Sequence, residues 1–419
     1  MKKIIVIGPA LSASGYGEQT RFALRSLKSQ SNAFDIYLKN INWGKTSWIS
    51  DDDEERVWLD RLIEKTNLFI QNKGAFDISL QVTIPNEWEK VAPINIGYTA
   101  GCETNKISPT WIEKCNIMDK IIVVSSFTKS VFDETWYSAI RNETGEQVTL
   151  KCEVPVEYAN YPFKEVEPEK SFELDLDFDF NFLTVAMWSP RKNIENTIKW
   201  FVEEFYDKEV GLVAKVSSAK NSHLDSLLTQ QKIQNILNKY PDRKCKVYML
   251  HGDLTKNEMT SLYQHPKVKA LINIGHGEGF GLPMFEAAYN ELPVIACGWS
   301  GHCDFLFIPK KKKNGKVKNT PYFAPVDFRI DTVQKEAHWE TIIDKDSKWC
   351  FPDQGSYKMT LRKVLSNYDQ YKDRARSLNK WIRENFTAEA MYKNFADHVH
   401  RDSAESLFWD GKINEMEMM

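Results

Sequence analysis

Residues 271–305 read LINIGHGEGFGLPMFEAAYNELPVIACGWSGHCDF, and this stretch decides the fold class of the chain. The short apolar run 271–274 predicts a buried strand, and the glycines at 275, 277, 279 and 281 predict a turn after it. An apolar helical pattern begins near Pro283, and the run 294–296 predicts the next strand. A strand, glycine turn and helix in this order point free backbone N–H groups and the positive end of a helix at a phosphate.

Two glutamates accompany the glycine turn. Glu278 precedes the predicted helix, and Glu286, eight positions later, is expected on its first turn. A carboxylate repels phosphate but accepts hydrogen bonds from neutral hydroxyls. A site that holds phosphate by amides and hydroxyls by carboxylates suits a nucleotide sugar.

The segment from Glu278 to Glu286, EGFGLPMFE, followed by Pro293-Val294-Ile295, resembles the E-x7-E motif of retaining glycosyltransferase family 4. Segments 4–17, 121–128, 183–193 and 247–254 are also similar to family segments, in the same order along the chain. The likeness is strongest over 183–305. It implies an α/β fold of the GT-B type, in which two Rossmann-like domains with parallel sheets face each other across a cleft.

Alternating strand and helix patterns agree with two such domains, and 419 residues exceed the usual size of a single core. We expect an acceptor-side domain over 1–170 and a nucleotide-sugar-binding domain over 171–385. A helix within about 386–419 is expected to pack back on the first domain. Strands are predicted at 3–7, 34–39, 76–82, 94–98, 120–124, 182–187, 211–216, 246–250, 270–274 and 293–296. Helices are predicted at 16–29, 52–71, 109–117, 126–135, 193–206, 222–239, 255–264 and 282–290.

The resemblance also implies a donor site. Lys192 is expected to bind phosphate, Glu286 the ribose hydroxyls, and Glu278 the donor sugar. The family usually has an arginine five positions before this lysine, where this chain has Met187, so Arg191 or Lys215 is expected to supply the second charge. Asn193 is expected to cap the following helix. The remaining donor-binding candidates are Gly15, Gly17, Leu250, His251, His276, Gly279, Phe280, Gly281 and Leu282.

The first domain offers fewer acceptor candidates. Glu103 or Thr99 is expected to meet the acceptor where several family members carry a histidine, and His302 and Asp304 are exposed-loop candidates facing the cleft. We count Lys192, Arg191, Glu278 and Glu103 as the catalytic candidates. No cofactor and no metal site are expected; Asp51–Asp53 is better explained as a helix cap with first-turn acids. The expected substrate is a UDP- or GDP-sugar, and the resemblance implies retention at the anomeric carbon.

Composition bounds the partners. A net charge of −3 argues against a surface built wholly for nucleic acid, no run of 18 apolar residues predicts a membrane span, and seven scattered cysteines fit a reducing cytoplasm (the host's, if the chain is viral). The acceptor is predicted to be a glycan or small hydroxyl compound. Residues 309–320, PKKKKNGKVKNT, favour the alternative of hydroxymethylated bases in duplex DNA, or simply form a solvated hairpin at Asn314-Gly315. A non-catalytic sugar-nucleotide-binding protein is the second alternative. The oligomeric state is not predicted.

Overall fold

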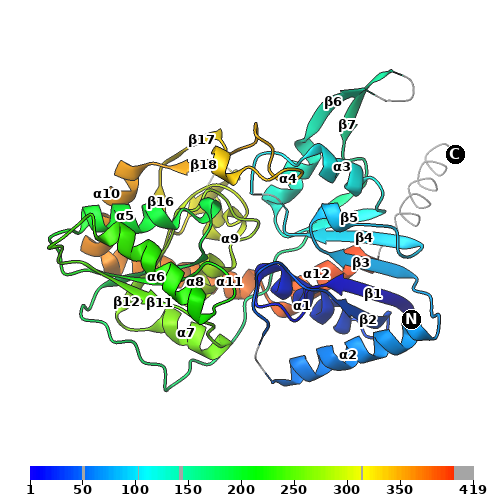
Figure 1. The fold of residues 1–419 in the computed structure, drawn as a ribbon, viewed down its shortest axis with the longest axis horizontal. Coiled ribbons are helices and arrows are strands. Elements are labelled where there is room, and N and C mark those ends of the chain that lie inside the picture. Colours follow the sequence, from blue (N-terminus) through cyan, green and yellow to red (C-terminus); the bar gives the residue numbers. More distant parts are fainter. Residues whose placement is uncertain (50–51, 102, 141–144, 313–314, 401–419) are drawn as a thin grey trace.

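The computed structural model describes residues 1–49, 52–101, 103–140, 145–312 and 315–400. These residues form two parallel sheets, each of six strands in the described part of the chain, with helices on both faces. Figure 1 shows the two sheets side by side, each in its own half of the molecule. The predicted two-domain GT-B architecture is confirmed.

The first sheet has the strand order β2-β1-β3-β4-β5-β8. Apolar runs in its central strands are buried on both faces, as parallel sheets require. Its strands are β1 (Lys2–Gly8), β2 (Phe34–Asn40), β3 (Ile78–Val82), β4 (Ile94–Thr99), β5 (Lys120–Val123) and β8 (Val156–Tyr158). Its helices are α1 (Gly15–Lys28), α2 (Glu54–Gln71), α3 (Pro109–Cys115) and α4 (Ser126–Glu134), with a 3-10 turn at Pro85–Glu87.

The second sheet has the order β11-β10-β9-β12-β13-β16. Its strands are β9 (Asn181–Met187), β10 (Gly211–Ser217), β11 (Lys246–Leu250), β12 (Val268–Asn273), β13 (Val294–Cys297) and β16 (Ala324–Val326). Its helices are α5 (Ile194–Glu204), α6 (His223–Leu237), α7 (Lys256–Gln264), α8 (Leu282–Tyr289), α9 (Cys303–Leu306), α10 (Gln354–Ser366) and α11 (Tyr368–Asn385). Two 3-10 turns, Pro190–Lys192 and Lys335–Ala337, complete this half.

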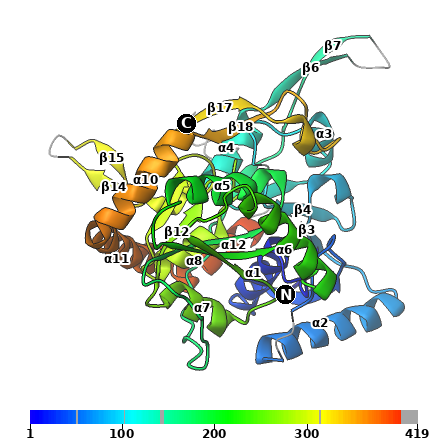
Figure 2. The same ribbon diagram turned by 60° about the vertical axis from the view of Figure 1, so that its left-hand side comes forward.

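In the described part of the chain, three antiparallel strand pairs stand outside the two parallel sheets. They pair β6 (Trp136–Ile140) with β7 (Gln147–Lys151), β14 (Phe307–Lys311) with β15 (Val317–Pro321), and β17 (Phe328–Thr332) with β18 (Lys348–Pro352). Figure 2 shows the first two projecting from the body of the molecule. The β14–β15 pair bears out the predicted lysine-rich hairpin, although Asn314 at its tip lies outside the described residues. The β6–β7 hairpin was not predicted, because the irregular rhythm after residue 140 resembled a connection.

Two chain crossings join the halves. Residues 159–180 lead from β8 to β9, and α12 (Ala388–His400) returns to the first half after α11. In α12, Phe395 packs edge-on against Phe22 of α1, with ring centroids 5.3 Å apart. The crossings also touch each other, since the Phe163 amide donates to the Phe386 carbonyl over 2.9 Å.

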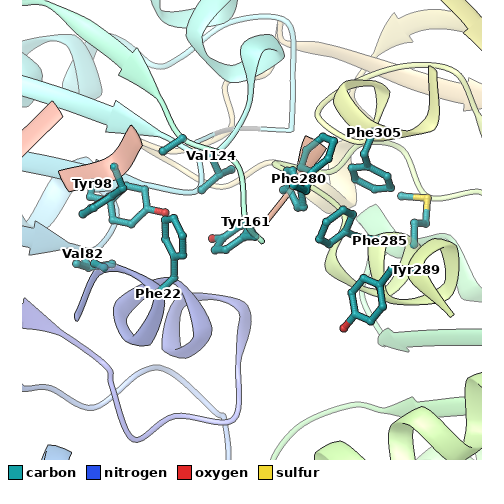
Figure 3. Close-up of a cluster of buried hydrophobic side chains, with 14 of the residues drawn as sticks. Phe22, Val82, Tyr98, Val124, Tyr161, Phe280, Phe285, Tyr289 and Phe305 are labelled. Atoms are coloured by element: carbon teal, nitrogen blue, oxygen red, sulfur yellow. The ribbon is translucent and has the colours of Figure 1, made fainter. Parts of the chain in front are cut away.

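Aromatic side chains continue the core from one half to the other. Tyr161, in the connection, lies between Phe22 of α1 and Phe280 of the glycine turn, with centroid distances of 5.2 and 5.1 Å (Figure 3). Phe280 in turn packs on Phe285 and Phe305. Burying each large ring stabilises the fold by roughly 1.5–3 kcal/mol, so this aromatic packing holds the glycine turn against the first domain.

Candidate functional site

The glycine turn 275–281 lies where β12 ends and faces Ala100 and Glu103, which follow β4. A Cβ on Gly279 would lie 2.4 Å from the Ala100 carbonyl oxygen, and one on Gly277 would lie 2.4 Å from that of Glu103. Gly281 has φ 95°, in the left-handed region, and is the residue before α8. These three glycines therefore allow the turn to approach the first domain and to enter the helix.

Four charged residues converge beside this turn. The Lys192 Nζ donates to Glu278 Oε1 over 2.5 Å, and Arg191 Nη1 lies 3.2 Å from Glu278 Oε2. Arg191 also contacts the first domain, because its Nη2 lies 3.1 Å from Glu103 Oε1. All four predicted catalytic residues are thus brought together. Arg191, and not Lys215, provides the charge next to Lys192; the Lys215 Nζ donates to the Gly252 carbonyl.

The protonation of this cluster follows from burial and charge. Burial alone would raise the pKa of Glu278, whose side chain is 8% exposed, but the charges of Lys192 and Arg191 lower the pKa to about 2. Burial, together with the neighbouring Arg191 charge, lowers the pKa of Lys192 below its ordinary value, against the opposing effect of Glu278. Glu278 is therefore ionised at neutral pH and is held by both cations.

Polar neighbours fix Glu278 in place. Asn273, the last residue of β12, donates from Nδ2 to Glu278 Oε1 over 3.1 Å, and its own Oδ1 accepts from the Gly275 amide. The Glu278 amide donates to Ser300 Oγ over 2.9 Å. Sequence reasoning missed Asn273 and Ser300. Asn273 carried a usable signal, since it stands at the carboxyl end of a predicted strand, where ligands of such sheets bind.

Glu286 lies farther along α8. The sequence predicted Glu286 on the first turn of this helix. Because the helix begins at Leu282, Glu286 is on its second turn instead. Tyr263 at the end of α7 donates its hydroxyl to Glu286 Oε2 over 2.9 Å. Burial raises the pKa of Glu286, and the Tyr263 hydrogen bond and the Lys164 charge only partly oppose that effect. No sequence pattern indicated Tyr263, whose position depends on how α7 packs beside α8.

The start of α1 belongs to the first domain. Gly15 is N1 of the helix, and Gly17 is glycine because a Cβ there would lie 1.9 Å from the Ser12 carbonyl oxygen. In the first turn of the helix, Glu18 accepts hydrogen bonds from Lys164 over 2.6 Å and from Arg25 over 2.8 Å. Burial alone would raise the pKa of Glu18, but the surrounding cations lower it. This ion-pair group and Glu286 are near enough that the charges of Lys164 and Glu286 interact.

Three histidines have structural environments. His276 is buried, stacks on Trp349 with an interplanar angle of 9°, and has its Nδ1 2.6 Å from the Cys350 carbonyl oxygen. His251 follows Leu250 at the end of β11 and pairs with Asp225 at 2.9 Å. His302 is 5% exposed, which corrects the expectation of an exposed loop residue; its Nε2 lies 2.6 Å from the Cys297 carbonyl oxygen.

Three further expectations are corrected by the hydrogen bonds. Thr99 is fully buried, and its hydroxyl pairs with that of Tyr16 at 2.8 Å, so it does not face an acceptor. Asn193 is at the N-cap of α5 but makes no side-chain cap; its Nδ2 donates to the Ile274 carbonyl. Asp304 faces the first domain as a contact residue, accepting from the Ser126 amide at 2.8 Å and from Asn160 Nδ2 at 2.9 Å.

The remaining donor candidates lie at the helix start. Phe280 is buried in the aromatic core, while Gly281 is the N-cap of α8 and Leu282 is its first residue, and the N–H groups of these two residues have no acceptor within the helix. The acidic run Asp51–Asp53 was predicted to cap a helix, and Asp53 does cap α2 by accepting a hydrogen bond from the Arg56 amide. Asp51 lies outside the described residues. In the described ranges, no three His, Cys, Asp or Glu side chains gather as metal ligands would, and no helix there is long and apolar enough to cross a membrane.

Comparisons with known proteins agree with this architecture. No family model matches the chain. A stretch of 118 residues is 32% identical to the serotype-specific mannosyltransferase WbdA of Escherichia coli, and it covers 27% of this chain but only 13% of that protein's length. Sucrose-phosphate synthase of Thermosynechococcus elongatus superposes with a TM-score of 0.60 at 13% identity, over 98% of this chain and 100% of that one. HepE of Anabaena, solved in complex with UDP and glucose, superposes with a TM-score of 0.54 at 11% identity, over 95% of this chain and 99% of that one.

Proposed function

We propose that the protein is a glycosyltransferase that moves a sugar from a nucleoside-diphosphate sugar to an acceptor hydroxyl. The observation that carries the proposal is the convergence of Lys192 and Arg191 on Glu278 beside the start of α8, with Glu286 farther along that helix. This arrangement combines two cations and a helix N-terminus with two carboxylates. It matches the distinct needs of a diphosphate and of sugar hydroxyls.

In the proposed reaction, Lys192, Arg191 and the backbone N–H groups of Gly281 and Leu282, where α8 begins, hold the diphosphate. Negative charge grows on the diphosphate as the bond from the sugar to the phosphate oxygen breaks. Fixed cations and N–H dipoles stabilise that charge without rearranging at the moment of reaction. We assign this task to these groups and to no metal ion.

The two glutamates bind hydroxyls in this scheme. Glu286 accepts hydrogen bonds from the ribose, and Glu278 accepts one from the transferred sugar. In the free protein the Glu278 carboxylate accepts a hydrogen bond from the Lys192 ammonium group. The diphosphate takes over Lys192 on binding, which releases one Glu278 oxygen toward the sugar. The name of the WbdA relative makes mannose the first sugar to test, and the UDP bound to HepE makes uridine the first alternative to guanosine.

The acceptor approaches from the first domain, along the loop that carries Glu103. The acceptor oxygen forms a bond to the anomeric carbon on the face that the phosphate leaves. The acceptor proton passes to the departing phosphate oxygen, so the product retains the anomeric configuration. Glu103, held by Arg191 across the cleft, is the proposed acceptor contact.

The class of acceptor has two candidates. A neutral glycan or small hydroxyl compound fits the net charge of −3. The β14–β15 hairpin favours DNA, because Lys310, Lys311, Lys312 and Lys318 are all exposed and no acidic residue occurs between Asp304 and Asp327. We place the neutral acceptor first. The free thiols of the described cysteines suit a reducing compartment such as the cytoplasm.

The proposal is tested by screening GDP-mannose, UDP-glucose and UDP-galactose for thermal stabilisation, followed by nucleotide release in EDTA with glycan and DNA acceptors. Stabilisation by one donor together with EDTA-resistant release is expected. Stabilisation without release from any donor would favour a non-catalytic sugar-nucleotide-binding protein. Release that needs an added divalent ion would overturn the assignment to Lys192 and Arg191.

A further inference from the structure

A cavity of about 630 Å³ lies in the second domain, away from the glycine turn. The ends of α7 and α8 and one side of α11 form its walls. Val268 and Leu292, which line it, are at the amino ends of β12 and β13, whereas the glycine turn follows the carboxyl end of β12. A six-residue strand spans about 20 Å, so the cavity and the turn are at opposite edges of the sheet. Its volume is in the range of small-molecule sites.

The lining is polar and carries positive charge. Lys372 and Arg383 on α11 line the cavity together with one carboxylate, Glu291. The Lys372 Nζ donates to the Glu291 carbonyl over 2.8 Å and lies 3.6 Å from its carboxylate. Arg383 pairs with Glu165, whose side chain is 77% exposed. An exposed pair of this kind contributes little to stability, so Arg383 remains accessible to a second anion.

Hydroxyl and amide groups complete the walls. Tyr289 is only 8% exposed, and its hydroxyl points away from the aromatic cluster that holds the rest of its neighbours (Figure 3). That hydroxyl makes no hydrogen bond to another described residue, and the ring lines the cavity. Asn290 and Gln264 add amides at the same wall, and Tyr368 adds a ring face. A lining that combines cations with neutral hydrogen-bonding groups suits a phosphate that is attached to a hydroxylated body.

We propose that this cavity is a second binding site, for a small phosphorylated molecule that carries hydroxyl groups, with Arg383 holding the phosphate and Lys372, three helical turns earlier on α11, contacting the hydroxylated body. The site has two physical connections to the rest of the fold. Tyr263 lines the cavity and donates its hydroxyl to Glu286. Arg383 pairs with Glu165 in the connection between the domains. An occupant therefore touches both a wall of the donor site and one of the interdomain crossings.

Two sources of this chemistry are sugar phosphates and nucleoside monophosphates, and calorimetry separates them. Glucose 6-phosphate, AMP, inorganic phosphate and glucose are titrated into the full chain in the absence of nucleotide sugar. At least one of the two organic phosphates is expected to bind at least tenfold more tightly than inorganic phosphate, and glucose is expected not to bind. Failure of both organic phosphates to bind would overturn the proposal.

Variants then locate the site. Lys372→Gln and Arg383→Gln should each weaken binding at least tenfold, and Tyr289→Phe, which removes one hydroxyl and keeps the ring, should weaken it severalfold. Lys380→Gln is the matched control, because Lys380 is exposed on the same helix and does not line the cavity. Unchanged binding in Tyr289→Phe and in both cation variants, or an equal loss in Lys380→Gln, would contradict the site.

A donor-site variant distinguishes this cavity from the donor site. Lys192→Ala should leave binding of the phosphorylated probe unchanged, and a tenfold loss would assign the probe to the donor site instead. The titration needs no turnover. If the chain has no transferase activity but binds the phosphorylated probe in a way that depends on Lys372, the cavity site is supported and the proposed function is not. If the chain is an active transferase but does not bind the probe, only the second site is contradicted.

Discussion

The Nζ of Lys192 lies 2.5 Å from Oε1 of Glu278, so the cation proposed for the donor diphosphate has a carboxylate partner in the free protein. The two residues are far apart in sequence, on the 3-10 turn after β9 and on the turn after β12. Neighbouring parallel strands bring them together, since β9 and β12 are adjacent in the sheet. The pair therefore links donor binding to the electrostatics of the free site.

Glu278→Gln should lower stability in a pH-dependent way. The folded pKa of Glu278 is about 2, below the ordinary value of 4.5, so its ionised form stabilises the fold above pH 4.5. That contribution declines as the pH falls from 4.5 toward 2, and it amounts to about 3 kcal/mol at most. Urea unfolding at pH 7 and at pH 3.5 measures it. A difference between wild type and variant that is the same at both pH values would contradict the ion-pair account.

Glu286→Ala should weaken binding of the nucleoside diphosphate about 10- to 100-fold, because a charge-assisted hydrogen bond to a ribose contributes roughly 1.5–3 kcal/mol. Glu389→Ala, at an exposed position of α12, is the control. Calorimetry with UDP and GDP gives the affinities. An unchanged affinity in a folded Glu286→Ala variant would remove Glu286 from the site.

The raised pKa of Glu286 predicts a pH dependence of the same affinity. Only the ionised carboxylate accepts two hydrogen bonds without donating, so affinity should fall as the pH drops through a midpoint above 4.5. Tyr263→Phe removes a hydrogen bond that favours ionisation and should move the midpoint to higher pH. The midpoint is obtained from calorimetric titrations between pH 4.5 and 8. A midpoint that moves downward in Tyr263→Phe would contradict the proposed role of the tyrosine.

Local patterns predicted much of this fold. Apolar runs with turn residues between them located the strands from β1 to β5 and from β9 to β13, because such strands are buried on both faces. The cluster of Lys192, Glu278 and Arg191 was also within reach, since each stands at a strand end. Tyr263, Ser300 and the Asp304 contact were not, because they depend on helix and domain packing between distant segments. The β6–β7 hairpin was missed because its exposed positions give a weak apolar pattern.

Asp304→Ala should favour separation of the domains. Asp304 accepts from the Ser126 amide at the start of α4, and an anion at a helix N-terminus contributes about 1 kcal/mol. Its loss shifts an open–closed equilibrium roughly fivefold. The radius of gyration from X-ray scattering should rise in Asp304→Ala and stay constant in Asp373→Ala, an exposed control on α11. Identical radii for wild type and both variants would contradict a closing role.

The lysine-rich hairpin distinguishes the two acceptor classes. Replacing Lys310, Lys311 and Lys318 with Ser should leave nucleotide affinity unchanged, because none of them contacts the donor cluster. With a neutral acceptor, the variant should also keep wild-type acceptor kinetics at every salt concentration. With DNA, each lost phosphate contact reduces the log–log salt slope by about one unit. A variant that loses tight duplex binding present in the wild type would replace the glycan acceptor with DNA.

Turnover in Lys192→Ala tests the central claim most directly. The measurement is nucleoside-diphosphate release at saturating donor, alongside donor affinity in the same preparation. Because the diphosphate gains charge as it leaves, its cation matters most in the transition state. Turnover should fall at least 100-fold while donor affinity falls less than tenfold. Wild-type turnover in Lys192→Ala, or equal losses of turnover and affinity, would contradict the account.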